Sequence, residues 1–266
     1  MSVPADDDPW AHMRAATPAR IGLARAGASI ATREHLTFQL AHARARDAVH
    51  EPFDPGALLV RLRERGLEAV QLHSAAADRP IYLARPDLGR RLDDASRAQM
   101  AAMPRGYDLA FVLADGLSAR AVASHAVPLL DETLPQLSCQ GLRIGPVAIV
   151  EQGRVAVGDE IGHRLGTALV CVLIGERPGL TSPDSLGAYL TWQPAPGRTD
   201  AERNCLSNIR PAGMACAEAA QRLVYLCTQA RLRGCTGVML KDETPSPSPR
   251  LQDNGPGEVD APLDSG

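Results

Sequence analysis

An apolar run ends abruptly at two charged side chains between residues 167 and 180. The run, from Thr167 to Ile174, is partly β-branched, and Gly175, Glu176 and Arg177 follow it directly. A continuous apolar run bounded by Gly and Pro is typical of a strand buried on both faces of a parallel sheet. Ligands of open α/β sheets bind outside the carboxyl ends of the strands, so an acid and a base placed there form a candidate binding site. The alternative is an ordinary strand-to-helix turn with a solvated ion pair, and this stretch alone leaves both interpretations open.

An acid follows a second apolar run in the same way. Residues 108–114 predict another buried strand, and Asp115-Gly116-Leu117-Ser118 comes next. This segment differs by one position from the G-x-S-x-G turn of α/β hydrolases, because Arg120 stands where the last Gly belongs. A free-standing hydrolase-like enzyme that uses Ser118 is therefore the alternative function, whereas a helix cap is the simpler interpretation of Asp115.

The other reactive side chains match no complete motif. None of the six Cys residues forms a C-x-x-C pair, which excludes a zinc ribbon or a thioredoxin-like site of that spacing. Cys205 lies in a polar stretch, residues 198–213, that predicts a functional loop, where it could be a reactive thiol, a polar contact or a small residue. Gly22 and Gly27 flank four residues as in a phosphate loop, but the Lys that should follow the second Gly is missing.

The elements that position these residues follow a simple order. Helical patterns at residues 32–49 and 55–64 come first, and strands then alternate with helices. This order predicts an α/β sheet, mostly parallel and flanked by helices, with a helical N-terminal segment beside it. The further strands expected are one that closes at Arg85, 146–151, 186–192 and 237–240, with short apolar runs at 69–72 and 154–157. The further helices open at Pro86, after Ser118 with an end or kink at Pro128, at Gly158 and at 217.

Composition is that of an ordinary globular protein. The 266 residues are 45% hydrophobic and 22% charged, and the formal net charge is −3. This charge and an aromatic content of 3% argue against nucleic-acid binding. No apolar run reaches the roughly 20 residues of a membrane helix, and the start lacks the pattern of a secretory signal, so a cytoplasmic protein is expected.

Changes in composition divide the chain into four expected parts. Residues 1–19 are polar and predict a flexible arm, and residues 20–75 form the helical segment. Residues 76–241 form the α/β domain. Residues 242–266 are rich in Pro and Ser and cannot bury a core, so a disordered tail is expected.

Five short motifs occur in one order between about residues 20 and 241. They are Y-L-A-R-P-D-L-G-R-R-L at 82–92, D-G-L-S at 115–118, G-R-V at 153–155, G-E-R-P-G-L at 175–180 and C-L-S-N-I at 205–209. In this order and spacing they resemble the small (light) subunit family of ethanolamine ammonia-lyase. Each motif alone is modest, whereas five in register are specific.

The resemblance implies a function that the individual motifs do not. Enzymes of this family use adenosylcobalamin to convert ethanolamine into acetaldehyde and ammonia by a radical mechanism. The resemblance implies that a large subunit, a TIM barrel, holds the substrate, and that the Rossmann-like small subunit helps to enclose the cobalamin between the two chains. The family's cobalamin contacts carry over onto Val155, Glu176 and Cys205. A carboxylate such as Glu176 can accept N–H bonds from the amide side chains of the corrin, and Val155 is expected to bond through its backbone.

The resemblance also implies what this chain does not supply. It implies no catalytic acid, base or nucleophile, so the isolated subunit is expected to be inactive. The D-x-H-x-x-G motif, whose His ligates cobalt in some cobalamin enzymes, is missing, and we expect no cobalt ligand from this chain. Family members often have a long polar N-terminal extension associated with bacterial microcompartments; Trp10 already lies close to the motifs, which argues against residence in a microcompartment.

Overall fold

Six strands form one sheet at the centre of the molecule. The computed structural model describes residues 9–17 and 19–244. Across the sheet the order is β3 (Ala69–His73), β5 (Val147–Glu151), β4 (Leu109–Ala114), β6 (Leu169–Gly175), β7 (Leu186–Trp192) and β8 (Arg203–Ile209). The first four strands in this order are parallel, and β7 runs antiparallel to both of its neighbours. The predicted α/β class, Rossmann-like with a mostly parallel sheet, is therefore confirmed.

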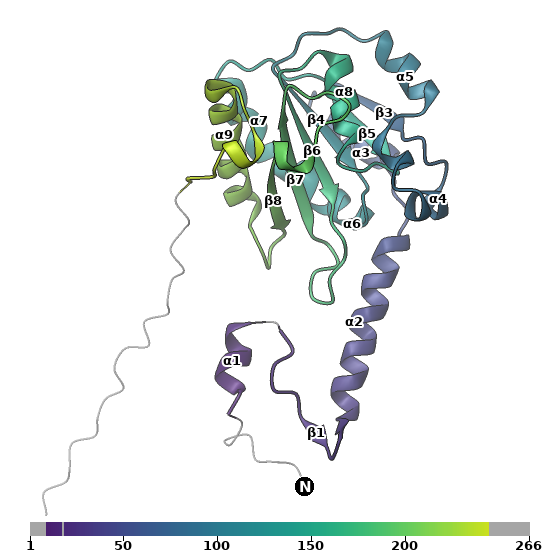
Figure 1. Cartoon of the computed structure of the whole chain (residues 1–266), viewed down its shortest axis with the longest axis vertical. Coiled ribbons are helices and arrows are strands. Elements are labelled where there is room, and N and C mark those ends of the chain that lie inside the picture. Colours follow the sequence, from purple (N-terminus) through teal and green to yellow (C-terminus); the bar gives the residue numbers. More distant parts are fainter. Residues whose placement is uncertain (1–8, 18, 245–266) are drawn as a thin grey trace, which may run out of the picture.

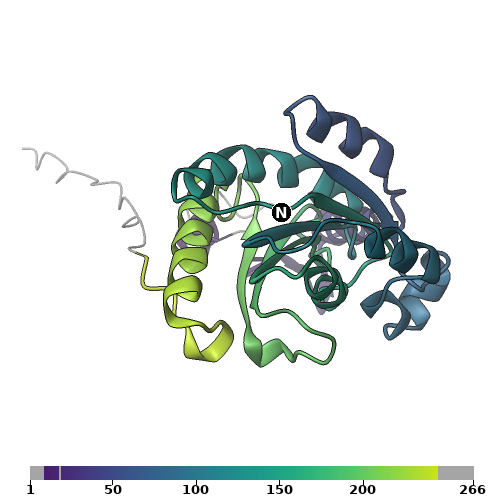
Figure 2. The same cartoon turned by 90° about the horizontal axis from the view of Figure 1, so that it is seen from above.

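Both faces of the sheet are covered, which explains why β4 and β6 are apolar throughout. Every residue of these two strands is buried. Alternate side chains enter two separate cores: Leu109, Phe111 and Leu113 pack into the larger one, and Ala110 and Val112 pack into the other. The larger core is covered by α3 (Pro55–Arg63), α7 (Val127–Cys139) and α9 (Cys216–Arg233), and the smaller one by α5 (Asp94–Ala101) and α8 (Val157–Leu165) (Figure 2).

The N-terminal segment is helical, as predicted, and contains a long exposed helix. It contains a hairpin of β1 (Arg25–Ala26) and β2 (Ser29–Ile30), followed by α2 (Thr32–His50). A short helix, α1 (Ala11–Ala16), precedes this segment and lies within residues 1–19, which were expected to form a flexible arm. Figure 1 shows α2 extending away from the sheet. Leu36, Phe38 and Leu40 on α2 expose 57%, 42% and 52% of their surface. Residues 1–8 of the predicted arm and 245–266 of the predicted tail lie outside the described residues.

The chain before Pro86 differs from the prediction. A strand closing at Arg85 and a helix opening at Pro86 are both wrong: α4 (Arg79–Ala84) comes first, and a single 3-10 turn, η2 (Leu88–Arg90), follows. The decisive start signal is Asp78, whose side chain accepts the Ile81 N–H at 2.8 Å. Arg85 ends α4 because the residue before a proline disfavours helical geometry.

The polar stretch at 198–213 is not a loop. It contains the 3-10 turn η4 (Asp200–Glu202) and the edge strand β8, which pairs with β7 across a β-bulge. An edge strand keeps exposed polar side chains, so β8 lacks the apolar pattern of the central strands. Residues 237–239 form a 3-10 turn, η5 (Gly237–Met239), rather than the predicted strand, and residues 155–156 turn into α8.

The helix after Ser118 continues past Pro128. α6 (Ala119–Ala121), the π-helical turn η3 (Val122–Ala126) and α7 follow one another without a break. Proline has no N–H to donate, and a π turn changes the local hydrogen-bond spacing. The expected irregularity therefore lies in η3, and Pro128 does not end the helix.

Candidate functional site

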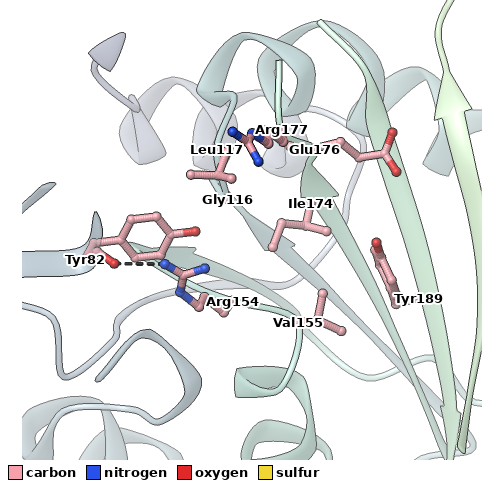
Figure 3. A pocket seen from close by; sticks show the side chains of 10 residues that line it. Tyr82, Gly116, Leu117, Arg154, Val155, Ile174, Glu176, Arg177 and Tyr189 are labelled. Carbon is pink, nitrogen blue, oxygen red and sulfur yellow. Dashed lines mark hydrogen bonds between the residues drawn. The ribbon is translucent and has the colours of Figure 1, made fainter. Parts of the chain in front are cut away.

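Four of the five motifs line one cavity beside the carboxyl ends of the parallel strands, and the fifth bonds to one of its side chains (Figure 3). The cavity has a volume of about 430 Å³ and is built largely by the loops after β4, β5 and β6. This is the crevice in which open α/β sheets bind ligands. The lining residues are Tyr82, Gly116, Leu117, Arg154, Val155, Ile174, Gly175, Glu176, Arg177 and Tyr189.

Glu176 lies in the cavity wall, where three donors hold its carboxylate. Ser207 Oγ donates to Oε1 at 2.6 Å, the Asn208 N–H donates to Oε2 at 3.0 Å, and the Ser185 hydroxyl donates to Oε2. A carboxylate has about four acceptor positions, so a position on Oε1 stays open to a ligand. Within the described chain Glu176 forms no ion pair with Arg177, which was the alternative interpretation. The carboxylate is therefore a fixed acceptor for an N–H group.

Two glycines let the loops after β4 and β6 touch at the cavity. The Leu117 N–H donates to the Gly175 carbonyl at 2.9 Å. A Cβ at Gly116 would lie 2.2 Å from that carbonyl oxygen, and a Cβ at Gly175 would lie 2.1 Å from the Ser118 carbonyl oxygen. Gly116 also has a φ of 56°, which disfavours other residues. This close approach therefore requires both glycines.

Arg154 and Val155 form the side of the cavity at the start of α8. The Arg154 N–H donates to the Gly89 carbonyl at 2.8 Å, and its guanidinium donates to the Tyr82 carbonyl at 3.0 Å and lies 4.5 Å from the centre of the Tyr82 ring. A Cβ at Gly89 would come within 3.0 Å of Arg154 Cγ, so the glycine leaves room for this packing. The Val155 N–H donates to no group of the described chain. The backbone of Val155 is therefore a free donor beside the cavity.

Cys205 lies next to the cavity without lining it. It is on β8 rather than in a loop, and it pairs with Tyr189 of β7, which does line the cavity. The thiol and the Tyr189 hydroxyl each affect the pKa of the other group. Partial burial raises the pKa of both groups, so both stay protonated near neutral pH. A protonated thiol is a poor nucleophile, which favours the polar contact among the three roles considered for Cys205.

A buried ion pair holds the loops behind the cavity. Asp115 is 2% exposed, accepts the N–H groups of Gly116 and Gly153, each at 3.0 Å, and pairs with Arg79 at 3.3 Å. Arg79 also donates to the Gly116 carbonyl at 2.8 Å. Burial raises the pKa of Asp115 to about 6, and the positive charge of Arg79 opposes that rise. Asp115 therefore joins the loops after β4 and β5 and is not the helix cap that its position suggests.

Ser118 is the residue that caps α6. Its hydroxyl accepts the Ala121 N–H at 3.3 Å and donates to the Pro183 carbonyl at 2.9 Å. The residue is fully buried, and both bonds are to backbone groups. Ser118 therefore has a structural role in this fold, which leaves the hydrolase interpretation without an accessible nucleophile.

The site also contains side chains that were not predicted as site residues, although Tyr82 lies in the first motif. Tyr82 and Tyr189 are two of only four Tyr in the chain, and both line the cavity. That scarcity is a signal in the sequence that could have identified them. Arg79 has no comparable signal. Its partner Asp115 is 36 residues away, and nothing in the sequence between them indicates that the two side chains meet.

The family model described as ethanolamine ammonia-lyase light chain (EutC) matches residues 7–241, which include all five motifs and every residue of the cavity. This chain belongs to that family. Three similar proteins are each named ethanolamine ammonia-lyase small subunit. They come from Azotobacter vinelandii (56% identical over 244 residues, 90% of each chain), Pseudomonas fluorescens (56% over 241 residues, 89% of this chain and 87% of the relative) and Pseudomonas syringae pv. tomato (57% over 240 residues, 89% and 84%).

Two further features of this light-chain family member bear on its site. Among the described residues, no group of three or more His, Cys, Asp and Glu side chains is arranged to hold a metal ion. No helix in the same part of the chain is long and apolar enough to span a membrane.

Proposed function

We propose that this chain is the small subunit of an adenosylcobalamin-dependent ethanolamine ammonia-lyase, and that its cavity holds one edge of the corrin. The observation that carries the proposal is the pairing of a fixed acceptor, Glu176, with a free backbone donor, Val155, at one cavity. The amide side chains of a corrin both donate and accept hydrogen bonds, so the two groups complement that edge. A cavity of about 430 Å³ accommodates part of a cobalamin and leaves the rest to another chain.

When bound, adenosylcobalamin supplies the radical chemistry that converts ethanolamine into acetaldehyde and ammonia. The residues of this chain bind and orient. Glu176 accepts an amide N–H, the Val155 N–H donates to an amide carbonyl, and Cys205 with Tyr189 adds a polar contact at the border of the cavity. The loops joined by Asp115 and Arg79 hold the wall of the cavity in place beside this edge. None of these groups acts as an acid, base, nucleophile or cobalt ligand in the proposal.

A large subunit completes the proposed enzyme. The relatives are named small subunits, which supports a larger partner chain. The exposed apolar side chains of Leu36, Phe38 and Leu40 on α2 also support contact with another chain. We infer that this partner is a TIM barrel that holds ethanolamine and faces the cavity, so that the cobalamin is enclosed in a hetero-oligomer.

Reconstitution tests the proposed function. The purified chain alone, with adenosylcobalamin, should produce no acetaldehyde from ethanolamine, because the proposal places the substrate site on the large subunit. Adding the large subunit should produce acetaldehyde, measured by a coupled alcohol dehydrogenase. The control mixture contains the large subunit and adenosylcobalamin without this chain, and it should show little turnover. Turnover by the isolated chain, or undiminished turnover in its absence, would contradict the proposal.

A further inference from the structure

A second cavity, lined by arginines, lies beside the first. It has a volume of about 430 Å³ and shares Arg154 and Val155 with the first cavity. A larger cavity of about 700 Å³ continues across the start of α8, and Arg90 and Arg198 line both of these cavities. Arg91 lines the larger one. We call the surface formed by Arg90, Arg91, Arg154 and Arg198 the arginine groove.

The arginine groove has more positive charge than its neighbouring acids neutralise. Arg90, Arg91 and Arg154 pair with no carboxylate of the described chain, and the Arg154 Nε is buried without a hydrogen-bond partner. This excess is local, since the formal net charge of the whole chain is −3. Of the four groove arginines only Arg198 pairs with an acid, Glu202. The other acids around the groove are engaged by arginines outside it: Asp159 by Arg203 at 2.6 Å, Glu160 by Arg97 and Arg164 at 2.7 and 3.1 Å, and Asp200 by Arg203 at 3.5 Å.

The backbone adds free donors at the same place. Ala156 is the N-cap residue of α8, and no side chain caps this helix. The N–H groups of Val155 and Ala156 donate to no group of the described chain. Free N–H groups at a helix start attract anions, because they carry the positive end of the helix dipole. Guanidinium groups and backbone donors therefore point to one kind of ligand, an anion with several oxygen acceptors.

We propose that the arginine groove binds the phosphodiester of the same cobalamin whose corrin edge occupies the first cavity; this inference rests on the proposed function. Arg154 and Val155 line both cavities, so an anionic group attached to the corrin enters the groove without leaving the site. The nucleotide tail of a cobalamin carries its negative charge on the phosphodiester. Guanidinium groups match phosphate oxygens in geometry as well as charge.

The test substitutes Arg90 in the complex reconstituted with the large subunit. Arg90 is exposed and has no partner in the described chain, so Arg90→Gln should leave the fold intact. The Kd for cyanocobalamin should rise about tenfold, as for the loss of one charge-assisted hydrogen bond. The Kd for dicyanocobinamide, which lacks the phosphodiester and the base, should change by less than about twofold. Arg90→Lys should recover part of the cobalamin affinity, and Arg231→Gln, a matched loss of charge on α9, should change neither Kd.

Phosphorus NMR of bound cyanocobalamin gives a readout that does not depend on activity. The wild-type complex should shift the phosphodiester resonance from its position in free cobalamin, and Arg90→Gln should reduce that shift. If Arg90→Gln loses affinity equally for cyanocobalamin and dicyanocobinamide, or for neither, the inference is overturned. The groove would then be expected to contact an acidic segment of the large subunit instead. Inorganic phosphate that binds the groove without lowering cobalamin affinity also overturns the inference.

The same titrations separate failure of this inference from failure of the proposed function. If Glu176→Gln weakens both ligands while Arg90→Gln weakens neither, the corrin occupies the first cavity and the assignment of the groove is wrong. If neither Glu176→Gln nor Arg90→Gln weakens either ligand, the corrin is not held at Glu176 and both assignments are wrong.

Discussion

Replacing Glu176 with Ala is expected to weaken cobalamin binding to the reconstituted complex about 100-fold, which corresponds to about 2.7 kcal/mol. The change removes a charge-assisted hydrogen bond to a corrin amide, worth roughly 1.5–3 kcal/mol. It also deprives Ser185, Ser207 and the Asn208 N–H of their common acceptor, so the cavity wall loses its fixed shape. Titration of cyanocobalamin, followed by absorbance, measures the Kd.

Glu176→Gln separates the charge of this side chain from its shape. Gln keeps one acceptor oxygen and places an NH₂ group among donors, so we expect a loss of about tenfold in affinity. Glu132→Gln, an exposed carboxylate on α7, is the matched control and should leave the Kd unchanged. Turnover at saturating adenosylcobalamin should fall less than affinity, because Glu176 transfers no proton in the proposed function. Unchanged affinity for cobalamin in both Glu176 variants would show that the corrin does not contact this wall of the cavity.

Replacing Arg79 with Met is expected to lower the free energy of unfolding by about 3 kcal/mol at pH 8. The substitution keeps a long side chain but leaves the buried carboxylate of Asp115 without its cation. It also removes the hydrogen bond that Arg79 donates to the Gly116 carbonyl at the cavity. Urea unfolding of the variant and the wild type measures the difference.

The loss of unfolding free energy in Arg79→Met should depend on pH, and the direction of this dependence follows from the pKa of Asp115. Burial raises this pKa to about 6 from its ordinary value of 3.8. Between these values the folded protein binds the proton more readily than the unfolded chain, so stability from protonation is present at low pH and is lost as pH rises through about 6. Without Arg79 the pKa of Asp115 in the folded protein rises further, so the stability from protonation continues to be lost up to a higher pH.

The stability gap between wild type and Arg79→Met should therefore be smaller at pH 5 than at pH 8. The control is the double variant Asp115→Asn with Arg79→Met, which has no buried charge and should recover part of the lost stability at pH 8. Its gap to the single variant should close as pH falls. A deficit of equal size at both pH values would show that Arg79 acts through packing and not through the charge of Asp115.

The central strands could be located from the sequence because burial on both faces leaves a strong local pattern. β4 and β6 are apolar at every position, and their carboxyl ends carry Asp115 and Glu176 as the pattern indicates. β8 could not be recognised in this way, since an edge strand is half polar and its pairing with β7 is a long-range property. The start of α4 was missed because Pro86 outweighed the cap at Asp78 in the local pattern.

The candidate site was only partly visible in the sequence. Glu176 stood out by its place after a buried strand, whereas Val155 and Cys205 were assigned through the family resemblance. The structure brings Val155 and Glu176 to one cavity and leaves Cys205 beside it, paired with Tyr189 of the neighbouring strand. The contacts that complete the wall join distant segments: Ser207 reaches Glu176 across 31 residues. Local spacing does not report such contacts, so only the folded chain reveals them.

The most direct measurement is an experimental structure of this chain with the large subunit and cyanocobalamin. The proposal predicts one edge of the corrin in the cavity, with a corrin amide in hydrogen-bond distance of the Glu176 carboxylate and another at the Val155 N–H. A corrin bound wholly within the large subunit, with this cavity filled by protein or solvent, would contradict it.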